Sequence, residues 1–227
     1  YPVFVFFIMV SCSSTSKTGE FTDDEYAFTA RLVLEKARDQ AFLNLFRSLN
    51  GFNESMIPSS CSFIKEQSAQ IPGMDRLIRQ WSRSAKSFIL PLYERFTTYT
   101  AGLLSVLEID SPRTLVKSGD TAISDYCRTN LREEMADAIA GNLYGLDFSL
   151  WNKISSQYEA WYASRKLVYS EDIPYLKPVF TEKETAELLS LHLADLFFSY
   201  LGKAEALIHT TPDPDMDETA AKILGLY

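Results

Sequence analysis

The sequence has few of the residues on which most enzyme and metal sites depend. It contains 2 histidines and 3 cysteines in 227 residues, whereas zinc sites need three or four converging ligands. It has no Gly-rich phosphate loop, no Gly-x-Ser-x-Gly elbow and no convincing β-alternation beyond the first residues. These absences argue against zinc, P-loop and α/β-hydrolase chemistry, and we expect neither a metal nor a cofactor.

Positive charge is also scarce. The 22 Lys and Arg residues against 30 Asp and Glu give a net charge of −8. An acidic chain repels phosphate backbones, so we do not expect nucleic acid as a partner. Apolar residues make up 46% of the chain and aromatics 13%, which is enough for the core of one folded domain.

The opening apolar run is too short to cross a bilayer. Val3–Val10 reads VFVFFIMV, whereas a membrane-spanning helix needs about 20 apolar residues. A short apolar core followed by small polar residues, here SCSSTS, is typical of a secretory signal peptide, although a buried edge strand is an alternative. The chain begins with Tyr1 rather than Met, so we expect the start of this signal to be missing.

The residues MVSC, which end at Cys12, resemble a bacterial lipobox. This resemblance implies removal of residues 1–11 as a lipoprotein signal peptide and attachment of lipid to the Cys12 sulfur. Residues 12–22 would then be a flexible tether that holds the domain at a membrane surface without spanning it. Ser13 is, by the sorting rule of enteric bacteria, compatible with an outer-membrane lipoprotein on the periplasmic side.

Residues 23–227 show helical spacing almost throughout, which predicts an all-α domain, a single irregular multi-helix bundle. In 23–50, apolar residues recur every three or four positions and acids stand at the start. Thr181–Glu184 is a capping box that opens a long helix. Pro91 interrupts the long helical stretch 75–108, because its ring removes a backbone donor. Further helices are predicted near 59–70, 111–119, 120–144, 148–166 and 218–224.

The most distinctive stretch is KSGDTAISDYCR at 117–128. It resembles the Gly-Asp-Thr-Ala-Ala-Thr-Asp-Tyr-like run of a bacterial family, domain-of-unknown-function family 4197. Residues 50–60, 196–212 and 220–227 resemble further stretches of that family in the same order, among them a helix with a late glutamate. The resemblance implies an exported helical protein, often a lipoprotein, with no established activity.

A first candidate site comprises Asp120, Thr121, Asp125, Tyr126 and Arg128. Spacings of four and three place Thr121, Asp125 and Arg128 on one helix face. In the structural interpretation Asp120 caps the helix and Asp125 pairs with Arg128 or with a neighbouring helix. In the functional interpretation the five residues form a polar pocket for an anion or a polar head group.

A second candidate site is a basic stripe formed by Arg76, Arg79, Arg83 and Lys86. It lies opposite an apolar face of the same predicted helix. It is either a solvated face, a partner of an acidic helix such as the one bearing Glu133, or a surface that docks onto anionic lipid heads. A tethered domain would meet such heads at high local concentration.

The sequence does not decide whether Cys61 and Cys127 form a disulfide. An oxidising periplasm would allow them to pair. Cys127, however, lies among apolar positions of a predicted helix, where a buried free thiol is common.

Three functional hypotheses remain. The one we favour is a lipid-anchored bacterial envelope protein with a non-enzymatic binding or structural role at the membrane surface. The second is a carrier of a lipid or hydrophobic small molecule in a pocket between helices. The third is an enzyme that uses the Asp120–Arg128 region. An aromatic-lined cavity would favour the carrier, and a cleft with strongly perturbed carboxylates would favour the enzyme.

The lipid anchor gives the first testable prediction. We expect the mature protein to partition into detergent and the Cys12→Ala variant to stay in the aqueous phase, because the variant cannot carry the acyl chains. Phase separation in a nonionic detergent measures this. Equal partitioning of the two proteins would show that Cys12 carries no lipid anchor.

Overall fold

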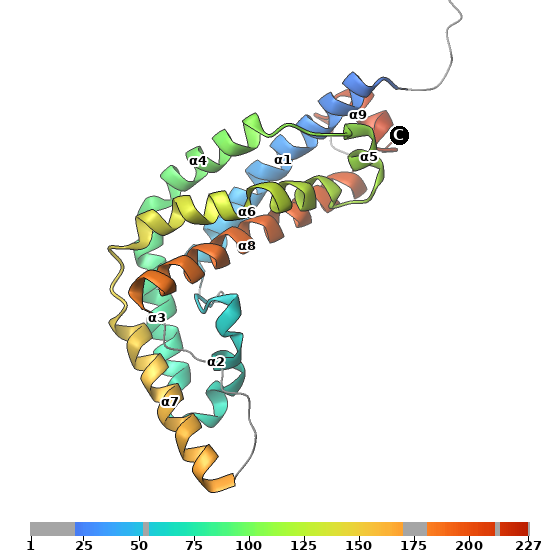
Figure 1. Cartoon of the computed structure of the whole chain (residues 1–227). Coiled ribbons are helices and arrows are strands. Elements are labelled where there is room, and N and C mark those ends of the chain that lie inside the picture. The colour runs from blue at the N-terminus through green and yellow to red at the C-terminus, as the bar shows by residue number, and fades with distance from the viewer. Residues whose placement is uncertain (1–20, 52–54, 170–180, 212–213, 227) are drawn as a thin grey trace, which may run out of the picture.

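The computed structural model describes residues 21–51, 55–169, 181–211 and 214–226, and within these ranges it contains helices and no strand. The all-α prediction is therefore confirmed. Figure 1 shows an upper bundle and a lower arm that meet at an angle. The predicted signal peptide, Cys12 and most of the tether lie outside the described residues. None of the described helices is long and apolar enough to span a bilayer.

Both parts are built from chain segments that are distant in sequence (Figure 1). The bundle contains α1 (Asp23–Asn50), α4 (Tyr93–Val106), α5 (Pro112–Lys117), α6 (Ala122–Leu143), α8 (Glu182–Thr210) and α9 (Glu218–Ile223). The arm contains α2 (Ser62–Gln67), α3 (Met74–Ile89) and α7 (Ser149–Tyr169), with the 3₁₀ turns η1 (Ser59–Cys61) and η2 (Ser68–Gln70) on either side of α2. The 3₁₀ turn η3 (Leu90–Leu92) joins the arm to the bundle.

The core of the bundle lies where α8 packs along both α1 and α6. Fully buried side chains follow each helix at spacings of three and four, the period that places them on one face. On α8 this stripe includes Leu189, Leu193, Phe197 and Leu201. Burial of each such side chain contributes roughly 1.5–3 kcal/mol, so this interface is the main source of stability in the bundle.

The two longest helices begin with the same cap. Thr22 precedes α1 and Thr181 precedes α8, and each hydroxyl accepts a 3.2 Å hydrogen bond from the backbone N–H three residues later. In return, the Glu25 and Glu184 carboxylates accept from the cap residues' N–H groups at 2.6 and 2.7 Å. The capping box predicted at Thr181 is confirmed.

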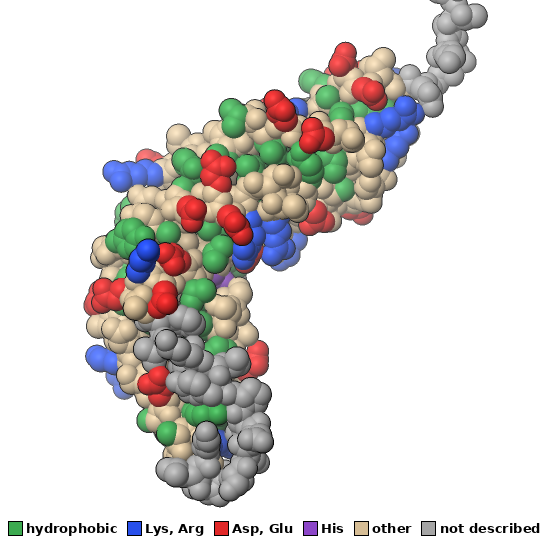
Figure 2. Space-filling view, in the orientation of Figure 1, with side chains coloured by type: hydrophobic (Ala, Val, Ile, Leu, Met, Phe, Trp, Pro, Cys, Tyr) green, Lys and Arg blue, Asp and Glu red, His purple; other side chains and the backbone are tan. Residues whose placement is uncertain are grey.

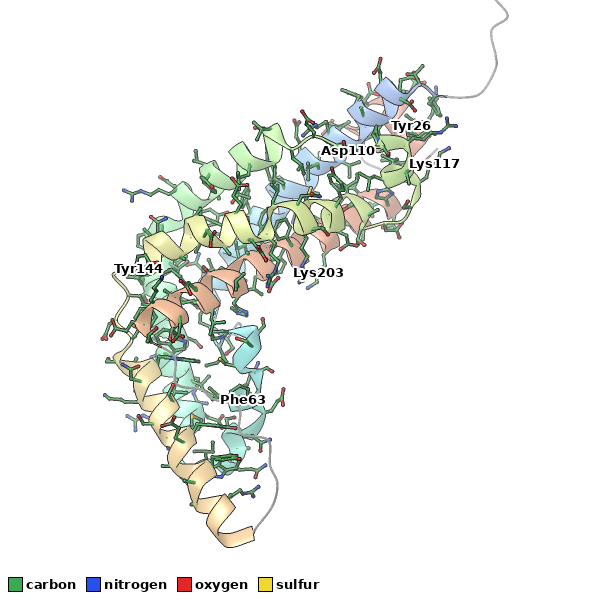
Figure 3. All side chains as sticks on the ribbon, viewed as in Figure 1. Tyr26, Phe63, Asp110, Lys117, Tyr144 and Lys203 are labelled. Carbon is green, nitrogen blue, oxygen red and sulfur yellow. The ribbon has the colours of Figure 1, made fainter. Side chains whose placement is uncertain are left out.

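The far end of the bundle is closed by α5. Its Lys117 ammonium lies 5.1 Å from the centroid of the buried Tyr26 ring of α1, and Figure 3 shows the two residues at the same end of the molecule. The Arg113 guanidinium lies 5.5 Å from the same ring. These cation–π contacts hold the short helix against α1.

The arm has an aromatic core of its own. The fully buried rings of Trp81 on α3 and Trp151 on α7 lie 5.6 Å apart, and Phe148 lies 5.9 Å from Trp81. Phe63, labelled in Figure 3, packs 5.2 Å from Tyr158 of α7. The aromatic residues of α7 therefore form a packed core between α2, α3 and α7.

Both described cysteine thiols are free and buried. Burial raises the pKa of the Cys61 thiol. Burial, followed by the nearby Glu205 carboxylate, raises the pKa of Cys127 to about 12. Neither thiol is therefore a reactive nucleophile at neutral pH.

Pro91 produces the interruption that the sequence predicts. It lies in η3, where the chain leaves α3 through one 3₁₀ turn and enters α4. The ring cannot donate a backbone hydrogen bond, so the regular α-helical ladder stops here. Because of this break, the consecutive helices α3 and α4 belong to different parts, α3 to the arm and α4 to the bundle (Figure 1).

Lys86 joins α3 to the end of α1. Its side chain is buried, with a residue exposure of 7%, and its ammonium donates to the Ser48 carbonyl at 3.2 Å and the Gly51 carbonyl at 2.7 Å. The prediction that Lys86 belongs to an exposed stripe is wrong. The carbonyls at a helix C-terminus carry partial negative charge, and α3 passes close enough for Lys86 to bind them.

Replacing this lysine should weaken the junction. We expect Lys86→Met to lower the free energy of unfolding by about 1–3 kcal/mol, because buried carbonyl groups would lose their charged donor. Urea denaturation followed by circular dichroism measures the change. The matched control, Arg76→Met at an exposed position of α3, should change stability by less than about 0.5 kcal/mol. Equal effects of the two substitutions would show that the lysine does not hold the junction.

Candidate functional site

A pocket of about 350 Å³ lies between α1, α4, α6 and α8, next to η3. Most of its wall consists of aliphatic and aromatic side chains. The described residues that line it are Leu45, Leu49, Ile89, Leu92, Tyr93, Arg95, Phe96, Tyr99, Ala138, Ile139, Asn142, Leu143 and Leu193. We call this space the apolar pocket.

The aromatic wall of the apolar pocket packs against further aromatic rings of α1 and α8. Phe42 of α1 packs edge-to-face against Tyr93 and Phe96, at centroid distances of 6.5 and 6.2 Å. Phe96 in turn lies 6.1 Å from the buried ring of Phe197 on α8. The wall rings are thus fixed by other rings, which favours a preformed pocket over one that must open for each ligand.

Few polar groups face the apolar pocket, and two of them already have partners. The Tyr93 hydroxyl donates to the Phe42 carbonyl at 2.7 Å, and burial raises the pKa of Tyr93. The Asn142 amide donates to the Ala138 carbonyl at 2.8 Å. Arg95, Tyr99 and Asn142 are exposed and mark the side of the pocket that opens to solvent.

The pocket exists because α4 packs less closely than its neighbours. The helix α8 contacts both α1 and α6 along its length, whereas α4 contacts α1 and α6 at only a few positions. Only Thr100 and Leu104 of α4 are buried. The wide spacing leaves room between the aromatic face of α4 and the aliphatic side chains of the other helices.

The predicted polar site does not form one pocket. Thr121 is the N-cap residue of α6, but its hydroxyl bonds to the Asp125 carboxylate at 3.1 Å on the exposed surface. The Tyr126 hydroxyl bonds instead to the segment before α5, at 2.9 Å from the Glu108 carbonyl and 3.4 Å from Asp110, which Figure 3 labels.

Arg128 points in a third direction, toward α8. Its guanidinium donates to the Asp195 carboxylate at 2.9 Å. Arg132 binds the same carboxylate through two nitrogens, at 2.7 and 2.8 Å. These bonds, with Arg132 contributing most, lower the pKa of Asp195. Arg128, and not Asp125, is therefore the residue of this set that pairs with a neighbouring helix, because α8 lies beside this face of α6.

The predicted cap at Asp120 is wrong, because Glu205 of α8 caps α6. The Glu205 carboxylate, 1% exposed, accepts from the backbone N–H groups of Ile123 at 3.0 Å and Ser124 at 2.7 Å. An anion at a helix N-terminus satisfies orphan donors and the helix dipole. The sequence did carry a signal for this contact, since Glu205 lies within the apolar spacing of α8, between Leu201 and Ile208.

His209 lies one turn after Glu205. Its Nε2 is 4.0 Å from the Glu205 carboxylate, and burial lowers the pKa of His209 while the nearby Asp120 opposes that shift. Ser124, Glu205 and His209 are the residue types of a hydrolytic triad. Ser124 is only 3% exposed, and the Glu205 carboxylate already accepts hydrogen bonds from backbone N–H groups. We therefore assign these three residues a structural role.

His192 and Asp217 also have structural partners. The His192 ring lies 3.1 Å from the Ser59 hydroxyl and 3.2 Å from the Ser55 carbonyl, which ties α8 to the arm. Asp217 caps α9 by accepting from the N–H groups of Thr219 and Ala220. Among the described residues, no group of His, Cys, Asp or Glu side chains is arranged to hold a metal ion.

Three residues of the predicted basic stripe line a second hollow, of about 480 Å³, between the end of α1, α2 and α3. These are Arg79, Arg83 and the buried Lys86, whereas Arg76 lies outside its lining. Within the described ranges, none of the stripe residues forms an ion pair with Glu133 or another acid of α6. On the face shown in Figure 2, by contrast, acidic and basic side chains are interspersed.

Comparisons with protein-family models, with curated proteins and with solved structures found no match to this chain. The likeness to domain-of-unknown-function family 4197 thus stays an expectation from the sequence.

The buried cap should give stability a distinct pH dependence. Burial raises the pKa of Glu205 even though the backbone donors oppose it. The folded protein therefore holds this proton more tightly than the unfolded chain does. The contribution of Glu205 to stability is greatest below about pH 4.3, the ordinary pKa of a glutamate, and declines as pH rises through the raised pKa.

We therefore expect the unfolding free energy of the wild type, relative to Glu205→Gln, to fall as pH rises from 4 toward 8. Urea denaturation across that range measures the difference. Glu187→Gln, at a more exposed position of α8, is the control for the loss of a glutamate elsewhere on the same helix. A relative stability that rises with pH would show that the backbone donors outweigh burial.

Proposed function

We propose that this protein is a non-enzymatic binding protein of the bacterial envelope that holds the apolar part of a small lipid-like molecule in the apolar pocket. In this proposal the lipid on Cys12 keeps the domain at the membrane surface, on the periplasmic side of the outer membrane. The observation that carries the proposal is the preformed pocket of about 350 Å³ with aliphatic and aromatic walls. Ligand pockets in proteins start at about this size and have mainly apolar linings.

The chemistry of the wall supports binding over catalysis. The described residues of the lining include no Asp, Glu, His, Cys or Ser side chain, so they offer neither a general base nor a nucleophile of the usual kinds. Apolar surface removed from water contributes about 25 cal/mol per Å². A ligand with a hydrocarbon part would gain from this wall, whereas a polar ligand would lose its hydration for few new hydrogen bonds.

The position of the domain supports a lipid-like ligand in particular. A tether of about ten residues would keep the pocket within a short distance of the bilayer, where amphiphiles are concentrated. An aromatic-lined cavity favours a carrier, and Tyr93, Phe96 and Tyr99 of α4 line this pocket. The carrier hypothesis therefore gains more from the geometry than the purely structural role does.

Filling the pocket tests this proposal. Ala138 is half-buried in the wall, and Ala138→Phe would place a ring in the space. We expect this variant to bind the apolar fluorescent probe N-phenyl-1-naphthylamine at least about tenfold more weakly than the wild type, because the new ring occupies the volume that the probe needs. Probe fluorescence titration measures the affinity.

Ala163→Phe on the exposed surface of α7 is the matched control and should bind the probe like the wild type. Thermal melts of both variants check that they are folded. Undiminished binding by folded Ala138→Phe, or no saturable binding by the wild type, would contradict the proposal.

A further inference from the structure

The second hollow is a basic groove next to the apolar pocket. Its cationic side chains are Lys65, Arg79, Arg83 and Lys86, and among the described residues Asp75 is the one acid in the lining. The net charge of the protein is −8, yet four cationic side chains line this one hollow of about 480 Å³. We call it the basic groove.

Two guanidinium groups of the basic groove are available to an anion. Arg79 and Arg83 lie one turn apart on α3, and both are exposed. Neither forms an ion pair with any residue that the structure describes. Lys86 differs, because its ammonium binds the last carbonyls of α1. Guanidinium groups present paired donors that match the oxygens of phosphate and carboxylate.

Hydroxyl groups of Ser55 and Ser82 also line the basic groove. Ser82 is buried, and its Oγ accepts the N–H of Met56 at 3.1 Å. The Oγ of Ser55 accepts the N–H of Ile57 at 3.3 Å. In the described part of the chain both hydroxyl protons are left for another acceptor, and an oxyanion is such an acceptor.

The basic groove and the apolar pocket are neighbours. Leu49, in the last turn of α1, lines both. On the other side, the consecutive residues Ile89 and Leu90 line the apolar pocket and the basic groove, respectively. The polar hollow and the apolar one are therefore adjacent, on either side of Leu49 and of the Ile89–Leu90 step.

We propose that the basic groove binds the phosphate head group of a single-chain amphiphile whose hydrocarbon part occupies the apolar pocket. This inference rests on the proposed function, and it adds the ligand class. Arg79 and Arg83 bind the phosphate oxygens, and the hydroxyls of Ser55 and Ser82 donate to them. The order of the two surfaces requires a molecule with one charged end and one apolar end.

The test compares two ligands with the same short acyl chain, a lysophosphatidate and the uncharged monoacylglycerol, both below their micelle concentrations. Each displaces N-phenyl-1-naphthylamine from the unlipidated full chain (Cys12→Ala). We expect the lysophosphatidate to displace the probe at a concentration at least about tenfold lower, because only it engages the guanidinium groups. In Arg79→Gln/Arg83→Gln this advantage should disappear, while displacement by the monoacylglycerol stays unchanged.

The matched control is Arg76→Gln/Lys153→Gln, which removes the same charge from exposed positions outside the basic groove and should keep the advantage. Equal displacement by the two ligands, or an advantage that survives in Arg79→Gln/Arg83→Gln, would overturn the head-group inference and leave the proposed function standing. Absence of probe binding would instead overturn the proposed function itself.

Inorganic phosphate separates a free anion from a head group. We expect millimolar phosphate to weaken displacement by the lysophosphatidate and not by the monoacylglycerol. If phosphate shifts the amide resonances around Arg79 and Arg83 but leaves lysophosphatidate displacement unchanged, the groove binds free phosphate and the inference of a joined site is wrong.

Discussion

The burial of the apolar face of α8 against α1 and α6 is the interaction on which the rest of the molecule depends. Because α8 is held on both sides, its other side chains reach fixed partners. Glu205 caps α6, Asp195 binds Arg128 and Arg132, and His192 contacts the segment that leads into the arm. One long helix therefore sets the register of the bundle and also ties the arm to it.

The proposed ligand site follows from the same arrangement. Because α8 packs against both α1 and α6, α4 lies at the margin and leaves the apolar pocket beside it. The turn at Pro91 makes α3 and α4 successive walls of two different hollows. A basic surface on the arm and an apolar surface in the bundle thus lie next to each other where the two parts meet. An amphiphile matches that order of surfaces, since its charged and apolar ends need different surroundings.

Much of the fold could be predicted from the sequence, but little of the site could. Apolar spacing marked α1 at its observed bounds, and the threonine–glutamate pattern marked the start of α8. Both signals act within one or two helical turns. The roles of Asp120 and Lys86 could not be read in this way, because each depends on a helix from a distant part of the chain. Glu205, and not Asp120, caps α6, by accepting from the N–H of Ile123, which lies 82 residues earlier in the sequence. Lys86 turns inward to reach α1.

The sequence by itself determined that this is an acidic, helical chain with a broken helix at Pro91, since charge, period and proline chemistry are local properties. Only the tertiary structure decided which polar side chains bind one another and where two hollows share Leu49. The physical reason is that a pocket is the space that packing leaves over. That space depends on the distances between helices, and no local pattern of residues encodes those distances.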